Sequence, residues 1–138
     1  MALKDKAWQV ALVGGILTLI GWITPFRWAS IGVYTSMTWS WGLAYDTYIG
    51  IIFAAQISVA GILIIISAII TLITSYLSKK RENLKLMAIL WLVSGILAII
   101  GIFVLIGMGA MTYLSFGFYL PLFGGIIVTV AGAMGLSR

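Results

Sequence analysis

The side chains able to do acid–base or nucleophilic chemistry are few and scattered along this sequence. Its three acidic residues, Asp5, Asp46 and Glu82, lie far apart, and there is no His or Cys. A metal centre, haem ligation by His, a Cys or Ser–His nucleophile and a buried carboxylate pair therefore all lack residues. Ser78 adjoins Lys79, which leaves a Ser–Lys pair formally open. We expect no enzyme activity, no metal site and no cofactor.

The composition explains this scarcity. The chain has 138 residues, of which 63% are hydrophobic and 8% charged, and its mean hydropathy is +1.22. These values are far from those of soluble domains and indicate an integral membrane protein. About twenty apolar residues in a helix cross a hydrocarbon layer of about 30 Å. Four stretches qualify, and they predict an all-α membrane protein with one four-helix domain over 1–138: Ala7–Thr24, Ile49–Leu77, Leu86–Met108 and Phe116–Leu136.

The basic residues predict the orientation of these spans. Lys and Arg near helix ends resist translocation, so they gather on the cytoplasmic side. Threading four spans puts every basic residue except Arg27 on one side, which predicts cytoplasmic N- and C-termini in a cell or viral membrane. The orientation of the spans thus accounts for the high pI of about 9.8, which gives no reason to expect a nucleic-acid partner. Anionic membrane lipids are the partners that a basic inner surface attracts.

The predicted outer loop, residues 25–48, has a different pattern. Between Ile31 and Leu43 the odd positions are mostly apolar and the even positions mostly small or polar. Alternation with aromatic and β-branched residues favours extended strand. We predict a small extracellular β-hairpin or sheet, although the residues leave open whether the run is a hairpin or one strand. The shorter stretch Gly109–Gly117 could add a strand beside it.

Four similar stretches, one in each predicted span, read VGGILTLIG, VAGILIIIS, VSGILAIIG and FGGIIVTVA. Each places two small residues six positions apart, and these are the predicted helix-packing residues: Gly15 and Gly21, Gly61 and Ser67, Gly95 and Gly101, and Gly125 and Ala131. Inside lipid, helices associate through close backbone approach at small residues. Helix packing is therefore the interpretation we favour, with a pore lining or a hinge as the alternative.

No acidic residue lies inside a predicted span, which excludes the small multidrug exporters, since these need an acid in their first helix. Gln56 is the most polar side chain within a span, and we expect it to bond to a neighbouring helix or a backbone carbonyl rather than to an ion or substrate. Buried hydroxyl groups are expected to bond to their own helix backbones: Thr18, Ser58, Ser67, Thr71, Thr74 and Thr129.

Aromatic residues near the predicted interfaces fit an interfacial belt: Trp8, Trp22, Trp28, Trp91, Tyr48, Tyr76 and Tyr119. Trp39 and Trp41 lie deeper in the outer loop, where they could cover the protein's own helices, enter the outer leaflet or meet a partner. The residues that we predict for contact between the outer loop and a partner are Trp28, Trp39, Trp41 and Tyr45.

The segments GWITPFRW, TWSWGLAY and FYLPLFGGIIVTVAG resemble, in their order, those of the claudin-like tetraspan family. Trp28 would match the first Trp of the family's loop, Gly42 and Leu43 its G-L pair, and Tyr45 lies near its final Trp. The loop cysteines of that family are missing, so no disulfide is expected. The resemblance implies a left-handed bundle of four helices with a small extracellular sheet, in proteins that associate side by side and face to face.

These observations predict a non-enzymatic membrane protein that acts by packing. It would be a self-associating tetraspan, a homo-oligomer, or an accessory subunit of a larger membrane complex. The alternative is a small oligomeric channel or holin-like pore former. A subunit that handles a lipid or a quinone is a third hypothesis.

Overall fold

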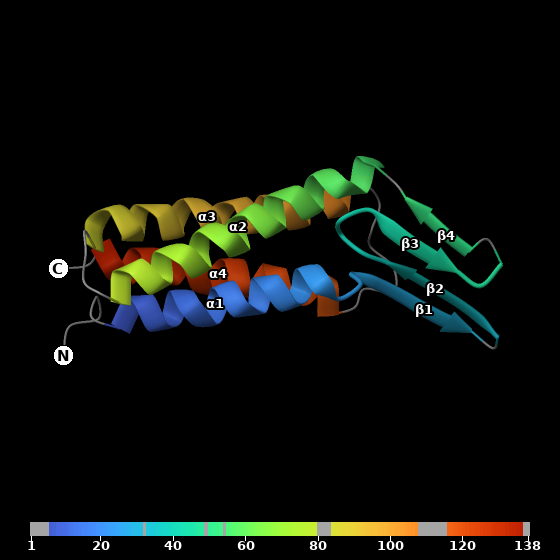
Figure 1. The fold of residues 1–138 in the computed structure, drawn as a ribbon, viewed down its shortest axis with the longest axis horizontal. Coiled ribbons are helices and arrows are strands. Elements are labelled where there is room, and N and C mark those ends of the chain that lie inside the picture. The colour runs from blue at the N-terminus through green and yellow to red at the C-terminus, as the bar shows by residue number, and fades with distance from the viewer. Residues whose placement is uncertain are drawn as a thin grey trace.

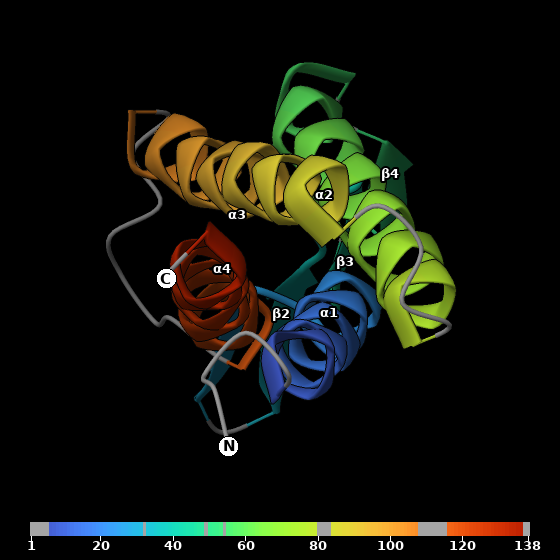
Figure 2. The same ribbon diagram turned by 90° about the vertical axis from the view of Figure 1, so that its left-hand side faces the viewer.

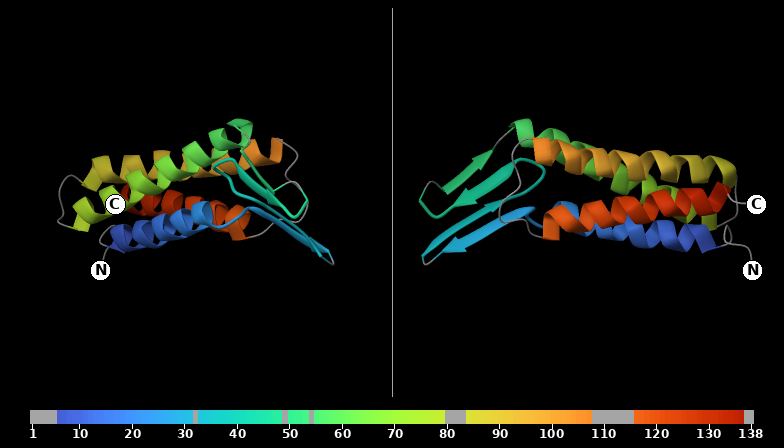
Figure 3. Two further views of the ribbon diagram at one scale, coloured as in Figure 1. Left: turned by 45° about the vertical axis from the view of Figure 1, so that its right-hand side comes forward. Right: turned by 180° about the vertical axis from the view of Figure 1, so that it is seen from behind.

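The computed structural model describes residues 6–31, 33–48, 50–53, 55–79, 84–107 and 116–136. Four helices lie side by side, and a small sheet projects from one end of them, here called the sheet end (Figures 1 and 3). The helices are α1 (Ala7–Ile23), α2 (Ala55–Lys79), α3 (Leu84–Gly107) and α4 (Phe116–Leu136). The start of α1 and the end of α4 both lie at the opposite end, here called the far end.

The predicted membrane-capable helices are confirmed for α2, α3 and α4. Their apolar stretches, Val59–Leu77, Lys85–Gly107 and Gly117–Leu136, have mean hydropathies of 2.3, 2.9 and 1.8 and are long enough to cross a bilayer. Helix α1 is apolar but has 17 residues, at the short limit of a span. A fourth span through α1 stays a prediction.

The loop after α1 folds into one antiparallel sheet of four strands. These are β1 (Arg27–Ile31), β2 (Tyr34–Thr38), β3 (Leu43–Asp46) and β4 (Gly50–Phe53), paired in chain order. The predicted small sheet is confirmed, and the alternative of a single long strand is wrong. The predicted start of the second helix at Ile49 is also wrong, because Gly50 turns the chain with a φ of 89° and the residues after it pair with β3. The possible strand at Gly109–Gly117 falls mostly outside the described residues, and its last residue belongs to α4.

Viewed from the far end, the four helices form a ring (Figure 2). Going round it, α1 packs against α4, α4 against α3, α3 against α2 and α2 against α1, with little contact across the diagonals. Large aliphatic side chains point outward, as Val13, Ile16 and Ile20 do from α1. Many of the buried residues are small or carry a hydroxyl, which fits helices surrounded by hydrocarbon.

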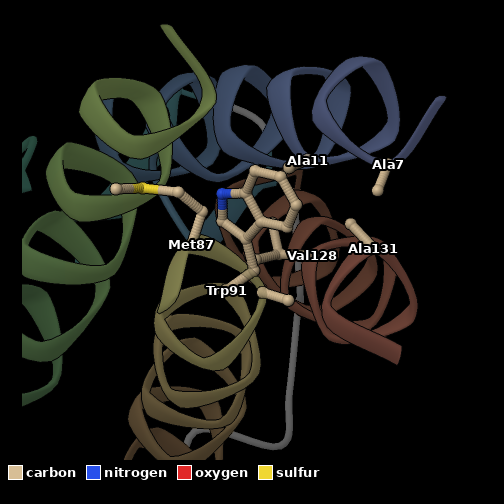
Figure 4. Packing of buried hydrophobic residues seen from close by; sticks show 7 residues of the cluster. Ala7, Ala11, Met87, Trp91, Val128 and Ala131 are labelled. Atoms are coloured by element: carbon tan, nitrogen blue, oxygen red, sulfur yellow. The ribbon is translucent and has the colours of Figure 1, made fainter. Parts of the chain in front are cut away.

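Two clusters of buried side chains fill the bundle. Near the sheet end, Phe26 from the start of the sheet packs among Ile64, Ile102 and Phe118. Near the far end the cluster surrounds Trp91 and includes Ala7, Ala11, Met87, Ala88, Val128 and Ala131 (Figure 4). Trp91 is 0% exposed, so its predicted place in an interfacial belt is wrong. Alanines on the facing helices leave room for the indole inside the bundle.

Candidate functional site

One close contact between α1 and α4 is made by two facing glycines. A methyl group at Gly14 would lie 2.8 Å from the carbonyl oxygen of Gly124, and one at Gly124 would lie 2.7 Å from that of Gly14. Thr18 stands beside them and donates its hydroxyl hydrogen to the Gly14 carbonyl over 2.8 Å. Any larger side chain at either glycine would push the two helices apart.

The contact between α3 and α4 repeats this arrangement. A methyl group at Gly95 would meet the Thr129 hydroxyl and lie 2.6 Å from the carbonyl oxygen of Gly125. Thr129 donates to that same carbonyl over 2.8 Å. In both contacts, therefore, a threonine four residues after a glycine bonds to that glycine's carbonyl, and a glycine on the other helix packs against the pair.

The contacts of α2 with α1 and α3 involve Gly15, Ser67 and Gly101. A methyl group at Gly15 would lie 3.0 Å from Thr71 Cγ2 on α2. Ser67 donates across the interface to the carbonyl oxygen of Ser94 on α3 over 2.6 Å. A methyl group at Gly101 would lie 2.9 Å from Ile64 Cγ1.

The other predicted packing residues have different neighbours. Gly21 lies against the ring of Pro121, which is inside α4 and fully buried. Ala131 belongs to the Trp91 cluster. Gly61 packs against the sheet: a methyl group there would lie 2.5 Å from the Ser40 carbonyl oxygen, in the turn between β2 and β3.

Several closely packed glycines lie outside the predicted set: Gly14, Gly117, Gly124, Gly132 and Gly135. The first and third adjoin predicted positions in Gly–Gly pairs. Those pairs, together with a Thr four residues after one of the glycines, are the sequence signal that could have identified these contacts.

One face of the sheet carries a row of apolar side chains. Directly paired residues of neighbouring strands point to the same side. The pairs Trp28–Met37, Met37–Tyr45 and Tyr45–Ile51 thus form a row across all four strands, here called the apolar row. Trp28 is 53%, Tyr45 38% and Ile51 73% exposed. The opposite face carries Arg27, Ala29, Ser36, Thr38 and Asp46, and by the same pairing also the positions of Ile31, Tyr34 and Ile52.

The structure divides the four aromatic residues predicted for partner contact into two pairs. Trp28 and Tyr45 lie in the apolar row. Trp39 and Trp41 are half-buried, with ring centroids 6.3 Å apart, and Trp41 lies 5.9 Å from Trp22 at the end of α1. The second pair thus covers the protein's own bundle.

The turn that carries Trp41 is tight. The Gly42 N–H donates to the Trp39 carbonyl over 3.0 Å, and Gly42 has a φ of 106°, which favours glycine. At the other side of β3, Asp46 Oδ1 accepts a bond of 2.8 Å from the Tyr48 N–H. The one described acidic side chain therefore has a structural role in a turn.

The remaining candidates for chemistry are not brought together. The side chains of Gln56, Ser78 and Lys79 lie outside the described part of the chain. Within that part, no three His, Cys, Asp or Glu residues gather where they could hold a metal ion. The geometry is therefore that of packing surfaces, inside the bundle and on the sheet.

Comparison with known proteins finds no family model that matches this chain and no curated protein that matches its sequence.

Proposed function

We propose that this protein spans a cell or viral membrane four times, with both termini in the cytoplasm and the sheet outside. It acts without catalysis, by associating through its sheet with a second copy or with a partner subunit. The outward aliphatic side chains of all four helices support the spans, as Ile16, Ile66, Ile96 and Ile126 illustrate. The described basic residues at the far end, Lys6, Lys79 and Lys85, support the orientation.

The observation that carries this proposal is the apolar row. Exposed Trp, Tyr and Ile side chains on one face of a small sheet are characteristic of protein interfaces, in which aromatic residues are enriched. The resemblance to claudin-like tetraspan proteins, which associate through their outer loops, agrees with this proposal.

The second candidate function is a pore, whose path would run between neighbouring copies of the protein rather than through one bundle. The two buried clusters fill the interior of a single bundle at both ends, Phe26 and Phe118 near the sheet and Trp91 near the far end. Release of a small fluorescent dye from liposomes separates the two functions. An association protein releases none above the background of empty liposomes, whereas a pore releases dye with a steep dependence on protein concentration.

The test of association is the mass of the protein, with bound detergent subtracted, after gentle extraction. We expect a homo-oligomer of defined size or a complex with other chains. Trp28→Ser and Ile51→Ser should shift the protein to the monomer, because each removes an anchor from the apolar row. Both side chains are exposed, so the fold should survive the substitutions.

The matched control is Val33→Ser. Val33 is 84% exposed in the turn between β1 and β2, outside the apolar row, so its loss should leave the assembly unchanged. A wild-type protein that is monomeric and free of partners in every mild detergent contradicts the proposal.

A further inference from the structure

Strand β4 leaves one edge of the sheet open. The strands pair in chain order, so β4 pairs with β3 on one side, and no described strand pairs with it on the other. Figures 1 and 3 show this outer edge turned away from the helices. Alternate residues of an edge strand direct their N–H and C=O groups outward, where water or another strand bonds to them.

The two edges of the sheet differ in charge and in surroundings. Strand β4 reads GIIF, without the charged residues or the proline that commonly protect an open edge. Strand β1, at the other edge, begins with the exposed, charged Arg27. Just before it, the Pro25 carbonyl accepts a bond of 3.0 Å from the Gly117 N–H of α4. Of the two edges, β4 is therefore the one suited to pairing with another strand.

The apolar row also ends at β4. Its last member, Ile51, is 73% exposed and is more exposed than Trp28 or Tyr45. Directly opposed residues of paired strands point to the same side of a sheet. A second sheet paired with this edge would therefore extend the apolar row on the same face and cover Ile51.

We propose that β4 pairs, edge to edge and antiparallel, with β4 of a second copy. This inference names the partner of the association proposed above, and it rests on that proposal for the place of the sheet outside the membrane. Four paired residues are too few to hold two copies alone. The edge contact therefore adds to docking through the face of the apolar row, and loss of either contact should release the monomer.

The pairing is symmetric. A two-fold axis normal to the sheet relates the copies, so one β4 edge satisfies the other and the contact closes at two chains. Opposed residues must belong to the same face of the sheet, so the residue at the axis lies opposite itself. The two central positions of β4 are Ile51 and Ile52. Charge does not oppose the contact, because β4 is uncharged and the two charges of the sheet, Arg27 and Asp46, have opposite signs.

The direction of β4 determines where the two bundles lie. Strand β4 ends at Phe53, and α2 begins at Ala55, so the end of β4 is joined to the bundle. Antiparallel pairing sets the ends of the two strands at opposite sides, which places the two bundles at opposite ends of the joined sheet. With both sheets outside the membrane, the two copies lie in facing membranes.

Single cysteines test the pairing, because the chain has none of its own. The Cα atoms of opposed residues lie about 4.5–5.5 Å apart, a separation that a disulfide spans. We expect Ile51→Cys or Ile52→Cys, whichever is at the axis, to link most chains into dimers under mild oxidation in detergent. The same variant should link differently tagged chains that are reconstituted in separate vesicle populations and then mixed.

Two control variants separate pairing from random collision. Val33→Cys lies in the turn between β1 and β2, where Val33 is 84% exposed, so collision alone would link it readily. Ser30→Cys lies in β1, at the opposite edge of the sheet, and Ser30 is exposed. Neither variant should give dimers under the conditions that link β4.

Hydrogen exchange of the wild-type chain measures the new backbone bonds directly. The outward amides of β4 should exchange roughly tenfold more slowly in the assembled form than in protein diluted to the monomer, the effect of one added hydrogen bond. The amides of β1 should exchange equally in both forms.

An assembled protein in which neither β4 variant links overturns the inference, as does linking of Val33→Cys or Ser30→Cys at the same rate as β4. Protection of the β4 amides in the monomer also overturns it, because the edge would then be covered within one chain. Linking in detergent but not between vesicles overturns the arrangement in facing membranes. All of these results leave association through the apolar row intact, whereas a wild-type protein that is monomeric and free of partners contradicts both proposals.

Discussion

Hydroxyl groups inside the bundle mostly bond to their own helix. Thr18, Thr74 and Thr129 donate to carbonyls three or four residues earlier, as the sequence predicted. Two predicted residues behave differently: Ser67 bonds across to α3, and Thr71 Oγ1 has no partner among the described residues. Ser58, another of the set, has its side chain outside those residues. Residue type predicts that a hydroxyl can bond locally, but the neighbouring helix decides whether it does.

Gly95 offers the sharpest test of packing by single residues. Gly95→Ala would place a methyl group against the Thr129 hydroxyl and 2.6 Å from a backbone carbonyl on α4, neither of which can move far. Overpacking of this kind costs about 1–3 kcal/mol. We expect a lower free energy of unfolding, measured by titration with a denaturing detergent.

Gly107→Ala is the control for Gly95→Ala. It lies in the same helix, and a methyl group there meets no described atom within 4 Å. Alanine favours helix over glycine by up to about 1 kcal/mol, so this variant should be unchanged or slightly more stable. Equal stability of the two variants would count against close packing of α3 on α4.

Among the elements, the sheet shows what a hydropathy pattern can and cannot reveal. The alternation from Ile31 to Leu43 correctly indicated extended structure. It did not reveal the turn at residues 39–42, because no Asn–Gly or Pro–Gly marks it and because Trp41 is held there by Trp22, far away in the sequence. The apolar run after Ile49 is compatible with either a helix or a buried strand, because a continuous run of apolar residues has no period that distinguishes the two. The prediction of a helix that begins at Ile49 was wrong for this reason.

The glycine repeat has a similar limit. Small residues in four apolar helices predict close contact, but their spacing does not identify the partner. Gly61 has the same place in its repeat as Gly15 and Gly95, yet it packs against the turn between two strands rather than a helix. The order of the helices round the ring decides which element packs against each glycine. That order depends on contacts between segments that are distant in the sequence.

Gly61→Ala tests how the sheet is seated on the bundle. The added methyl group would lie 2.5 Å from backbone atoms of Ser40 and Trp41, so the turn must lift from α2. We expect the contact between Trp22 and Trp41 to loosen, which near-ultraviolet circular dichroism and tryptophan fluorescence would report. The helical signal in the far ultraviolet should persist, since no helix–helix contact is altered. Unchanged aromatic spectra would show that the turn is not seated on Gly61.

At the scale of the whole molecule, membrane topology can be tested by labelling single introduced cysteines, without first replacing any native cysteine. The chain has no Cys, so each introduced Cys is unique. Ser30 in β1 and Lys6 before α1 are both exposed, one in the sheet and one at the far end. A membrane-impermeant maleimide added to intact cells should label the Ser30→Cys variant.

The Lys6→Cys variant should react only after the membrane is permeabilised. Both variants should react equally in detergent, which controls for the accessibility of the thiol. Labelling of both variants in intact cells would place the two ends of α1 on the same side, and α1 would then not span the membrane.

The ring of helices also bears on how the protein is made. The most extensive helix–helix contact joins α1 to α4, although α2 and α3 lie between them in the sequence. Until α4 leaves the ribosome, the face of α1 with Gly14 and Gly21 has no partner within the chain, although α1, α2 and α3 are complete. During synthesis, therefore, a face of α1 that fits a helix lacks its partner until α4 is complete, and during that interval a chaperone or the α4 helix of another copy could occupy it.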